Sequence, residues 1–179
     1  PATGANDLSV AEYVIATALV LLRGAYFATA DVVAGAWPRT RLMGREASGR
    51  TLGLVGFGAI ARETARRAAA LGMRIVASDP HLPASDPAWA MAERVALGDL
   101  LARADVVSLH VPLTEETRGL IGAGALARMR KDAILINAAR GGVVDEAALA
   151  AALKTGALGG AALDVFEEEP LSAARGAVF

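Results

Sequence analysis

Cysteine is absent from this chain of 179 residues, and its absence excludes both a disulfide framework and thiolate chemistry. It also fits a cytoplasmic protein, which is the location we expect. An excess of charge of either sign is missing too: 18 Lys and Arg residues face 19 Asp and Glu residues, a formal net charge of −1. Because no overall field would attract a polyanion, we expect neither nucleic acid nor an anionic membrane as a partner.

Long hydrophobic runs are missing as well, although 54% of the residues are hydrophobic. The most apolar stretch, Tyr13 to Leu22, holds ten residues between Glu12 and Arg23. A helix that spans a membrane needs about 20 such residues, so we interpret this stretch as a buried helix. No signal peptide is visible. Length and apolar content together predict one well-buried α/β domain.

A glycine-rich turn is the most informative feature that the chain does contain. The apolar run Thr51 to Val55 leads into Gly56-Phe57-Gly58-Ala59-Ile60-Ala61, and a helical stretch and a second apolar run follow. Gly56 permits a sharp turn, Gly58 lets a pyrophosphate approach the backbone, and Ala61 lets the helix pack closely on the strand. The N-terminus of the helix offers free N–H groups to phosphates. The pattern predicts a dinucleotide-binding βαβ unit, and the alternative is a plain crossover with an incidental glycine turn.

Asp79 closes the second apolar run, 79 − 56 = 23 residues after the first glycine. A carboxylate at about 20 residues accepts hydrogen bonds from the ribose hydroxyls of NAD and would repel the extra phosphate of NADP. We therefore expect NAD as the cofactor. The alternative is that Asp79 is only a turn residue before Pro80.

The rest of the chain alternates between strand and helix patterns. Six apolar runs predict strands at residues 51–55, 73–78, 94–97, 105–109, 133–137 and 160–165, and helices are expected at 63–71, 99–104, 124–129 and 145–154. This alternation predicts a Rossmann-type, doubly wound parallel sheet of order 3-2-1-4-5-6. The capping-box pattern Ser9 to Glu12 predicts a long N-terminal helix that ends near Gly35. The four arginines at positions 39, 41, 45 and 50 are interpreted as part of a solvated connector.

In such a sheet, ligands bind at the carboxyl ends of the strands around the switch point between the first and fourth strands. The first three strands would hold the adenosine half of the cofactor. The last three carry polar residues where the other half would lie, in segments 110–112, 137–142 and 164–169. Arg140 stands one short turn after an apolar strand, where its guanidinium could pair with a substrate carboxylate. From position alone, a structural role at the strand end is an equal alternative.

Four motifs carry a resemblance that covers nearly the whole chain. They are GANDLSVAEYV (4–14), VSLHVPLTEETRGLIG (107–122), NAARGGVVDEAAL (137–149) and ALDVFEEEPL (162–171). In order and spacing they resemble the D-isomer-specific 2-hydroxyacid dehydrogenases, and the first motif is most similar to the phosphoglycerate dehydrogenase branch. The resemblance implies hydride transfer between NAD(H) and a 2-oxo or 2-hydroxy acid.

The resemblance also implies roles for single residues. Arg140 would bind the substrate carboxylate and carbonyl, Glu169 would hydrogen-bond the acid–base histidine and raise its pKa, and Asp164 would hold the nicotinamide carboxamide. With the glycine turn and the strand ends, the expected cofactor contacts are Gly56, Gly58, Ala59, Ile60, Asp79, His110, Val111, Pro112, Thr117, Ala138, Ala139, Arg140 and Asp164. No metal site is expected.

The acid–base histidine itself has no counterpart here, because in the family it follows the Glu-Pro pair within a Pro-His pair. Only His81 and His110 are present. We interpret His81 as a surface residue and His110 as a residue that lines the cofactor site. Residues 1–179 are therefore expected to be the NAD-binding domain of a larger enzyme whose substrate domain flanks them, and alone they would turn over nothing.

Three matters stay open at the level of sequence. The substrate could be a phosphoglycerate, a sulfolactate, a glyoxylate or a lactate-like acid. The same fold also serves NAD-sensing corepressors, so a partner-binding protein without turnover is an alternative. A homodimer through the helical region 9–37 is expected, because apolar residues nearly surround the first half of that helix, and the alternative is a monomer that buries the same residues within one chain.

Overall fold

Six parallel strands form a single sheet in the order β3-β2-β1-β4-β5-β6, which confirms the predicted topology. The computed structural model describes residues 4–172 and Gly176. The strands are β1 (Thr51–Val55), β2 (Arg74–Ser78), β3 (Glu93–Arg94), β4 (Val106–Leu109), β5 (Ile134–Asn137) and β6 (Gly160–Leu163). The helical elements are α1 (Asp7–Arg23), η1 (Ala25–Ala28), α2 (Thr29–Val33), α3 (Ala59–Ala70), η2 (Pro87–Met91), α4 (Leu97–Arg103), α5 (Ala123–Leu126) and α6 (Glu146–Lys154).

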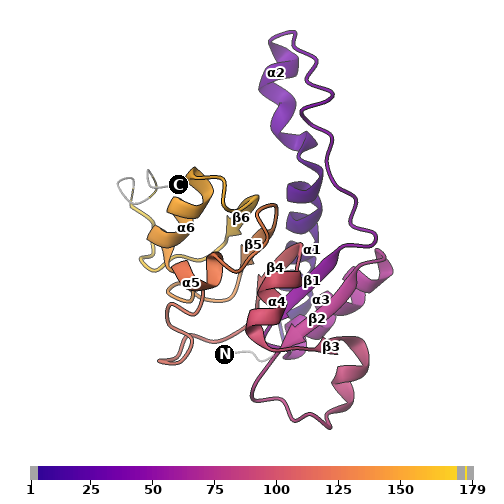
Figure 1. Cartoon of the computed structure of the whole chain (residues 1–179), viewed down its shortest axis with the longest axis vertical. Helices are drawn as coiled ribbons and strands as arrows, with labels where there is room; N and C mark the ends of the chain where they lie inside the picture. The colour runs from indigo at the N-terminus through magenta and orange to yellow at the C-terminus, as the bar shows by residue number, and fades with distance from the viewer. Residues whose placement is uncertain (1–3, 173–175, 177–179) are drawn as a thin grey trace.

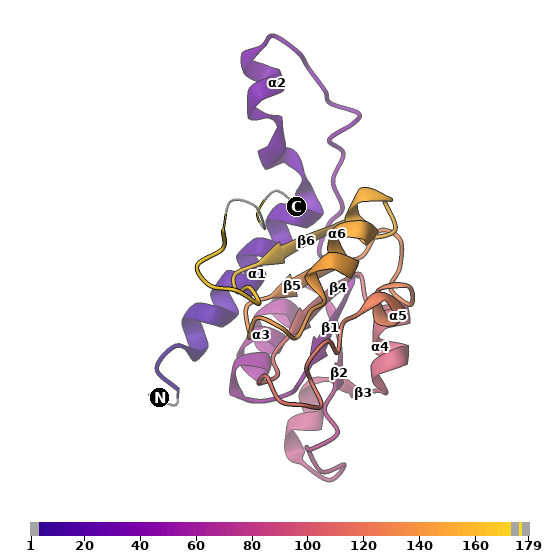
Figure 2. The same cartoon turned by 90° about the vertical axis from the view of Figure 1, so that its left-hand side faces the viewer.

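Helices cover both faces of this sheet, with α1 and α3 on one face and α4, α5 and α6 on the other (Figure 2). Successive strand residues point to opposite faces. Leu52 and Leu54 of β1 therefore join the core under α1 and α3, whereas Val55 joins the other core. Gly53 lets α4 pack closely on β1, because a Cβ there would lie 2.6 Å from Leu100 Cδ2 and 2.9 Å from Ala104 Cβ. Burial on both faces explains why the central strands have nearly continuous apolar sequences.

The N-terminal helix differs from the prediction at its start and in its middle. It begins at Asp7, two residues before the expected cap, so Ser9 and Glu12 lie inside it and form no capping box. It ends at Gly24, whose φ of 64° is the left-handed conformation that terminates helices. The apolar pattern continues past this break into η1 and α2, and for that reason the sequence predicted one helix. The prediction of one helix ending near Gly35 was therefore wrong, although the last helical element of this region, α2, does stop at Val33.

Beyond Gly24 the chain forms an arm, which we define as residues 24–45. The arm stands away from the body of the domain, with η1 and α2 going out and an irregular segment coming back (Figures 1 and 2). Arg41 of the returning segment forms an ion pair with Asp31 of α2. Six large apolar side chains of the arm are exposed, and they belong to Tyr26, Phe27, Val32, Val33, Trp37 and Met43.

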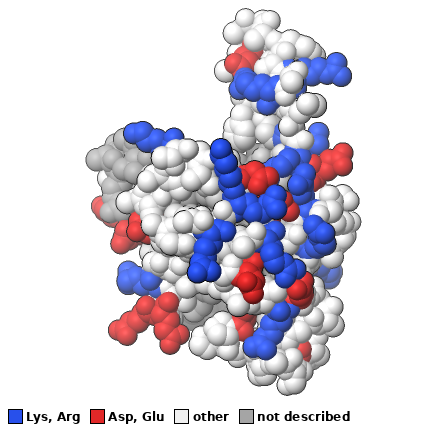
Figure 3. All heavy atoms as spheres, viewed as in Figure 1, with Lys and Arg blue, Asp and Glu red and all other residues white. Residues whose placement is uncertain are grey.

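The predicted solvated connector is largely exposed, but three of its arginines have carboxylate partners in the structure. Besides the pair in the arm, Arg45 contacts Asp132 at 3.0 Å and Arg50 contacts Asp105 at 3.5 Å. Asp105 is only 4% exposed and also accepts a hydrogen bond from the Thr51 N–H at 2.8 Å. Figure 3 shows Lys and Arg side chains gathered below the arm with acidic side chains between them. These pairs attach the connector to the amino edge of the sheet.

Within the described residues, no single helix is both long and apolar enough to cross a membrane, although α1 and the segment Tyr26–Val33 together would pass as a bent pair. Four side chains of α1 are buried within this domain, and they belong to Ala11, Val14, Ala18 and Leu22.

Candidate functional site: a cleft at the carboxyl edge of the sheet

The glycine turn after β1 is wedged between the ends of β2 and β4. Gly56 has a φ of 84°, and its N–H donates to Ser78 O at 2.9 Å. On the other side, the His110 N–H donates to Val55 O at 2.7 Å. A Cβ at position 56 would lie 2.6 Å from the carbonyl oxygen of His110. Only glycine therefore satisfies both the backbone angle and the contact.

The start of α3 is open to a ligand. Gly58 is the N-cap residue and makes no side-chain capping bond, and a Cβ placed on it would meet no atom within 4 Å. The N–H groups of Gly58, Ala59 and Ile60 have no acceptor within the described part of the chain. Free N–H groups at the positive end of a helix dipole bind phosphate oxygens. The sequence predicted this arrangement, and the geometry is suited to a pyrophosphate.

Asp79 is both a turn residue and a wall of the cleft. One carboxylate oxygen accepts from the Phe57 N–H at 2.8 Å, and the other accepts from the N–H groups of His81 at 2.9 Å and Leu82 at 3.2 Å. A carboxylate has about four acceptor positions, so three backbone donors leave room for a ligand hydroxyl. The sequence left two roles open for Asp79, a ribose ligand and a turn residue. The two roles are compatible, because the hydrogen bonds of the turn fix the carboxylate that faces the cleft.

A cleft of about 1230 Å³ lies over the carboxyl ends of β1, β2, β3 and β4. Seven of the predicted cofactor residues line it: Gly56, Gly58, Asp79, His110, Val111, Pro112 and Thr117. Its volume exceeds the roughly 300–1,000 Å³ typical of small-molecule pockets, as an extended dinucleotide requires. The open glycine, the free N–H groups and the fixed acid together fit NAD.

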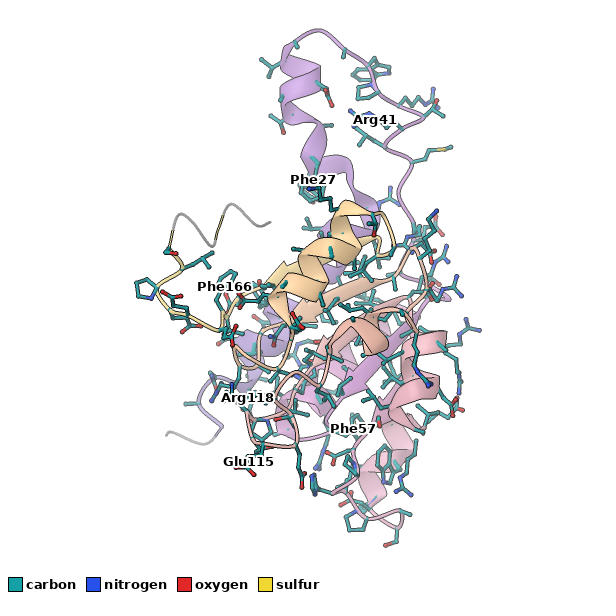
Figure 4. The ribbon with its side chains drawn as sticks, turned by 60° about the vertical axis from the view of Figure 1, so that its left-hand side comes forward. Phe27, Arg41, Phe57, Glu115, Arg118 and Phe166 are labelled. Carbon is teal, nitrogen blue, oxygen red and sulfur yellow. The ribbon has the colours of Figure 1, made fainter. Side chains whose placement is uncertain are left out.

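Sequence reasoning missed several residues that line the cleft. Those after β2 and β3 are Ser78, Pro80, Arg94, Val95, Ala96 and Leu97, and those on the loop after β4 are Thr114, Glu115, Glu116 and Leu120. The topology itself could have indicated the residues after β3, because the carboxyl ends of neighbouring parallel strands share one edge. Behind this end, Phe57 stacks on Trp89 at 5.2 Å between ring centroids, and the Arg94 guanidinium lies 5.6 Å from the centroid of Trp89. Figure 4 shows Phe57 low on the body, apart from the arm.

The two histidines differ in their surroundings. Burial lowers the pKa of His110 to about 4, so its imidazole is neutral at pH 7. Its Nε2 lies 3.0 Å from Ser108 Oγ, which holds the ring at the end of β4. His81 is exposed at the mouth of the cleft, where its Nε2 lies 3.7 Å from a carboxylate oxygen of Glu116. His110 thus lines the cleft and His81 lies at the surface, as the sequence predicted.

Arg140 lies on the loop that follows β5. Asn137 holds this loop, because its Nδ2 donates to Arg140 O at 3.0 Å and its Oδ1 accepts from the Ala139 N–H at 3.1 Å. The guanidinium of Arg140 is exposed and donates to Ala139 O at 2.6 Å. Four guanidinium N–H groups of the five are then open to a ligand.

The loop after β6 lies directly against the Arg140 loop. The Asp164 N–H donates to Asn137 O at 2.9 Å, and a Cβ on Gly141 would overlap the carbonyl oxygen of Phe166. Glu169 accepts from the Phe166 N–H at 2.9 Å. The structure thus brings together the two loops that carry Ala138, Ala139, Arg140, Asp164 and Glu169, beside the cleft rather than lining it.

Comparison with known proteins identifies a family. The model described as "D-isomer specific 2-hydroxyacid dehydrogenase, NAD binding domain" matches residues 15–177. An (S)-sulfolactate dehydrogenase of Chromohalobacter salexigens is 61% identical over 174 residues, which cover 97% of this chain and 56% of that protein. A D-3-phosphoglycerate dehydrogenase of Methanocaldococcus jannaschii is 45% identical over 171 residues, which cover 94% of this chain and 32% of that protein. The chain thus spans about half or less of the length of these relatives.

Solved structures agree with this family assignment. The NAD-dependent formate dehydrogenase from Staphylococcus aureus in complex with NAD superimposes with a TM-score of 0.89 at 32% identity, over 97% of this chain and 52% of that one. A D-lactate dehydrogenase from Sporolactobacillus superimposes with a TM-score of 0.86 at 39% identity, over 93% of this chain and 49% of that one.

A pair of glycine variants separates binding from folding. Gly58→Ala adds a methyl group in open space, so unfolding free energy should change by less than about 1 kcal/mol, while the affinity for NADH should fall about tenfold because the methyl group occupies the phosphate position. Gly56→Ala should instead destabilise the fold by about 2 kcal/mol or more through strain and overlap. Urea unfolding and NADH titration measure the two effects. Unchanged NADH affinity in Gly58→Ala would contradict the assigned phosphate site.

Proposed function

The chain belongs to the D-isomer-specific 2-hydroxyacid dehydrogenases, as their NAD-binding domain, and from this premise we propose that the whole protein oxidises or reduces a small 2-hydroxy or 2-oxo acid with NAD. The observation that supports the proposal most strongly is the exposed guanidinium of Arg140. It stands on a loop that Asn137 holds and that packs on the acidic loop after β6, beside a cleft that fits NAD. A dehydrogenase of this class needs a cation beside the cofactor to pair with the carboxylate of its substrate.

Each residue of the site would have a distinct task. When bound, NAD supplies or accepts the hydride. Arg140 would pair with the substrate carboxylate through two parallel N–H donors and thereby orient the reacting carbon. Glu169 would hydrogen-bond an acid–base histidine from the part of the protein outside this chain, and His110, neutral at pH 7, would only line the site. The N–H groups at the start of α3 and the carboxylate of Asp79 would hold the far end of the dinucleotide.

The substrate class follows from the relatives by analogy only. The relative with 61% identity is named an (S)-sulfolactate dehydrogenase, and others with 44–45% identity are named D-3-phosphoglycerate dehydrogenase and hydroxypyruvate reductase. We therefore place sulfolactate first among the acids to assay, followed by phosphoglycerate and hydroxypyruvate. The natural acid is the one with the highest kcat/KM.

Arg140→Ala tests the function. In the whole protein, this change should lower kcat/KM for the preferred acid by about a thousandfold, because the substrate carboxylate loses its charge partner. NADH affinity should stay within about threefold, since Arg140 does not line the cleft. Arg128→Ala, which removes an exposed arginine near α5, is the matched control. Normal turnover by Arg140→Ala would refute the proposed function, and so would a wild-type protein that oxidises none of these acids.

The choice of NAD over NADP depends on Asp79. Its carboxylate is fixed by three backbone donors, so it cannot turn away from an added 2′-phosphate, and NADPH should bind at least about tenfold more weakly than NADH. Asp79→Asn keeps the size of the side chain and should reduce the difference in affinity between NADH and NADPH. The measurement is a titration with both reduced cofactors, and equal affinities for the wild-type protein would contradict the role of Asp79.

A second copy of the chain is the partner that the arm fits best, and we propose a homodimer in which two arms pack together. The arm exposes a large apolar surface, with Val33 83% and Trp37 81% exposed, and it projects away from the cleft (Figures 1 and 4). Exposed apolar surface of this kind is characteristic of interfaces, and a twofold dimer would bury the same side chains on both subunits. In Figure 4, Phe27 lies at the base of the arm and Arg41 on its returning segment.

Trp37→Lys tests the dimer. A charge at an aromatic position that the dimer would bury should weaken association by about 2 kcal/mol or more, which corresponds to at least about a thirtyfold rise in the dimer dissociation constant. Sedimentation of the whole protein over a range of concentrations measures it. Leu71→Lys, at an exposed apolar position at the end of α3, is the matched control. A wild-type protein that sediments as a monomer at micromolar concentration would refute the proposal.

A further inference from the structure

The loop after β6, residues 164–169, carries the acidic residues of the proposed site but has little regular structure of its own. Its first residue is anchored by the Asp164 N–H bond to Asn137 O. Its middle rests on Gly141, where the two backbones are too close for any side chain. Figure 4 shows Phe166 on this loop, next to α6.

Glu146 supplies a further tie to the middle of this loop. Its carboxylate, in the first turn of α6, accepts a hydrogen bond from the Glu167 N–H at 2.6 Å, across 21 residues of sequence. Glu146 is 8% exposed, which is unusual for a glutamate. It is not needed as a helix cap, because Asp145 performs that task by accepting from the Ala148 N–H at 2.9 Å. A buried carboxylate that bonds a backbone N–H forms a short and strong charge-assisted hydrogen bond.

Two adjacent N–H groups of the loop thus donate to two different carboxylates. The Phe166 N–H donates to Glu169, which lies on the loop itself, whereas the Glu167 N–H donates to Glu146, which lies on a helix. The first bond sets the shape of the loop around Glu169. The second bond fixes the position of the loop relative to α6 and the sheet. Without the second bond, the loop would keep its local turn but lose this hydrogen bond to α6.

We propose that Glu146 is a positioning residue, which holds the 164–169 loop so that Glu169 stays at a fixed place relative to Arg140. The inference rests on the proposed function, because it assigns Glu146 a role in that same site. Displacing a catalytic group by about 1 Å can cost about a hundredfold in rate. Arg140 has its own support through Asn137. Loss of the Glu146 bond therefore affects proton transfer rather than binding of the acid.

Two variants of similar size distinguish the bond from mere packing. Glu146→Gln retains an oxygen that accepts from the Glu167 N–H, whereas Glu146→Met fills the same space without a good acceptor. In the whole protein, Glu146→Met should lower kcat about tenfold or more, while KM for the acid and the affinity for NADH stay within about threefold of their wild-type values. The kcat of Glu146→Gln should stay within about threefold of the wild-type kcat. The rate of 2-oxo acid reduction in the Met variant should also begin to fall at lower pH, because a displaced Glu169 no longer raises the pKa of the acid–base histidine.

Hydrogen exchange provides a readout that needs no turnover. Amide exchange of segment 164–172 should be faster in Glu146→Met than in wild type, and unchanged in Glu146→Gln. Asp99→Ala, which removes an exposed acid from the first turn of α4, is the control for loss of a helix-terminal charge. If Glu146→Met does not fold, Glu146→Asp, whose side chain is too short to reach, replaces it with the same expected changes.

The outcomes separate the two proposals. A wild-type protein that turns over no 2-hydroxy acid overturns the proposed function, while exchange in segment 164–172 still tests the tie. If the wild-type protein turns over the acid, and Glu146→Met has a normal kcat, pH profile and amide exchange rate, the role of Glu146 is refuted and the proposed function stands. A Gln variant as slow as Met also overturns it, because the charge rather than the hydrogen bond would then matter.

Discussion

The close contact between the turn after β1 and the end of β4 is the constraint on which the site depends. At Gly56 the backbone must be left-handed and the carbonyl of His110 must come within a distance that excludes any Cβ. This contact keeps the two central strands level at their carboxyl ends. The chain leaves β1 toward α3 on one face of the sheet, whereas β2 and β4 flank it within the sheet. The cleft opens above this point, as expected at the switch point of a doubly wound sheet.

Backbone groups, more than side chains, give the cleft its charge pattern. The start of α3 presents unpaired N–H donors, and the neighbouring Asp79 presents a carboxylate that other N–H groups hold in place. Donors favour phosphate oxygens, and the acceptor favours ribose hydroxyls. The Phe57 N–H ties the two together, because it lies in the glycine turn and donates to Asp79. The turn and the acid thus behave as one unit, although 22 residues separate them.

The sequence could predict what depends on local pattern. The central strands were found within a residue or two, because burial on both faces leaves a continuous apolar run. The apolar pattern failed where a strand has no apolar residues. Strand β3 consists of Glu93 and Arg94, both exposed, and the predicted strand 94–97 overlaps it only at Arg94. The pattern also failed where an apolar run hides a break, as at Gly24, whose left-handed φ alone ends α1. The tie from Glu146 to Glu167 joins residues distant in sequence, so no local pattern could reveal it.

The two halves of the site are built on different principles, and this difference separates their functions. The adenosine half is defined by backbone geometry at glycines and a helix end, which the whole sheet enforces. The other half is defined by side chains that bridge loops: Asn137 for the Arg140 loop and Glu146 for the loop of Glu169. Backbone geometry enforced by a packed sheet has little freedom, whereas a loop held by a few hydrogen bonds can be adjusted by single substitutions. A family that keeps one cofactor and changes its substrates would benefit from this arrangement, because changes in the loops leave the cleft for NAD intact.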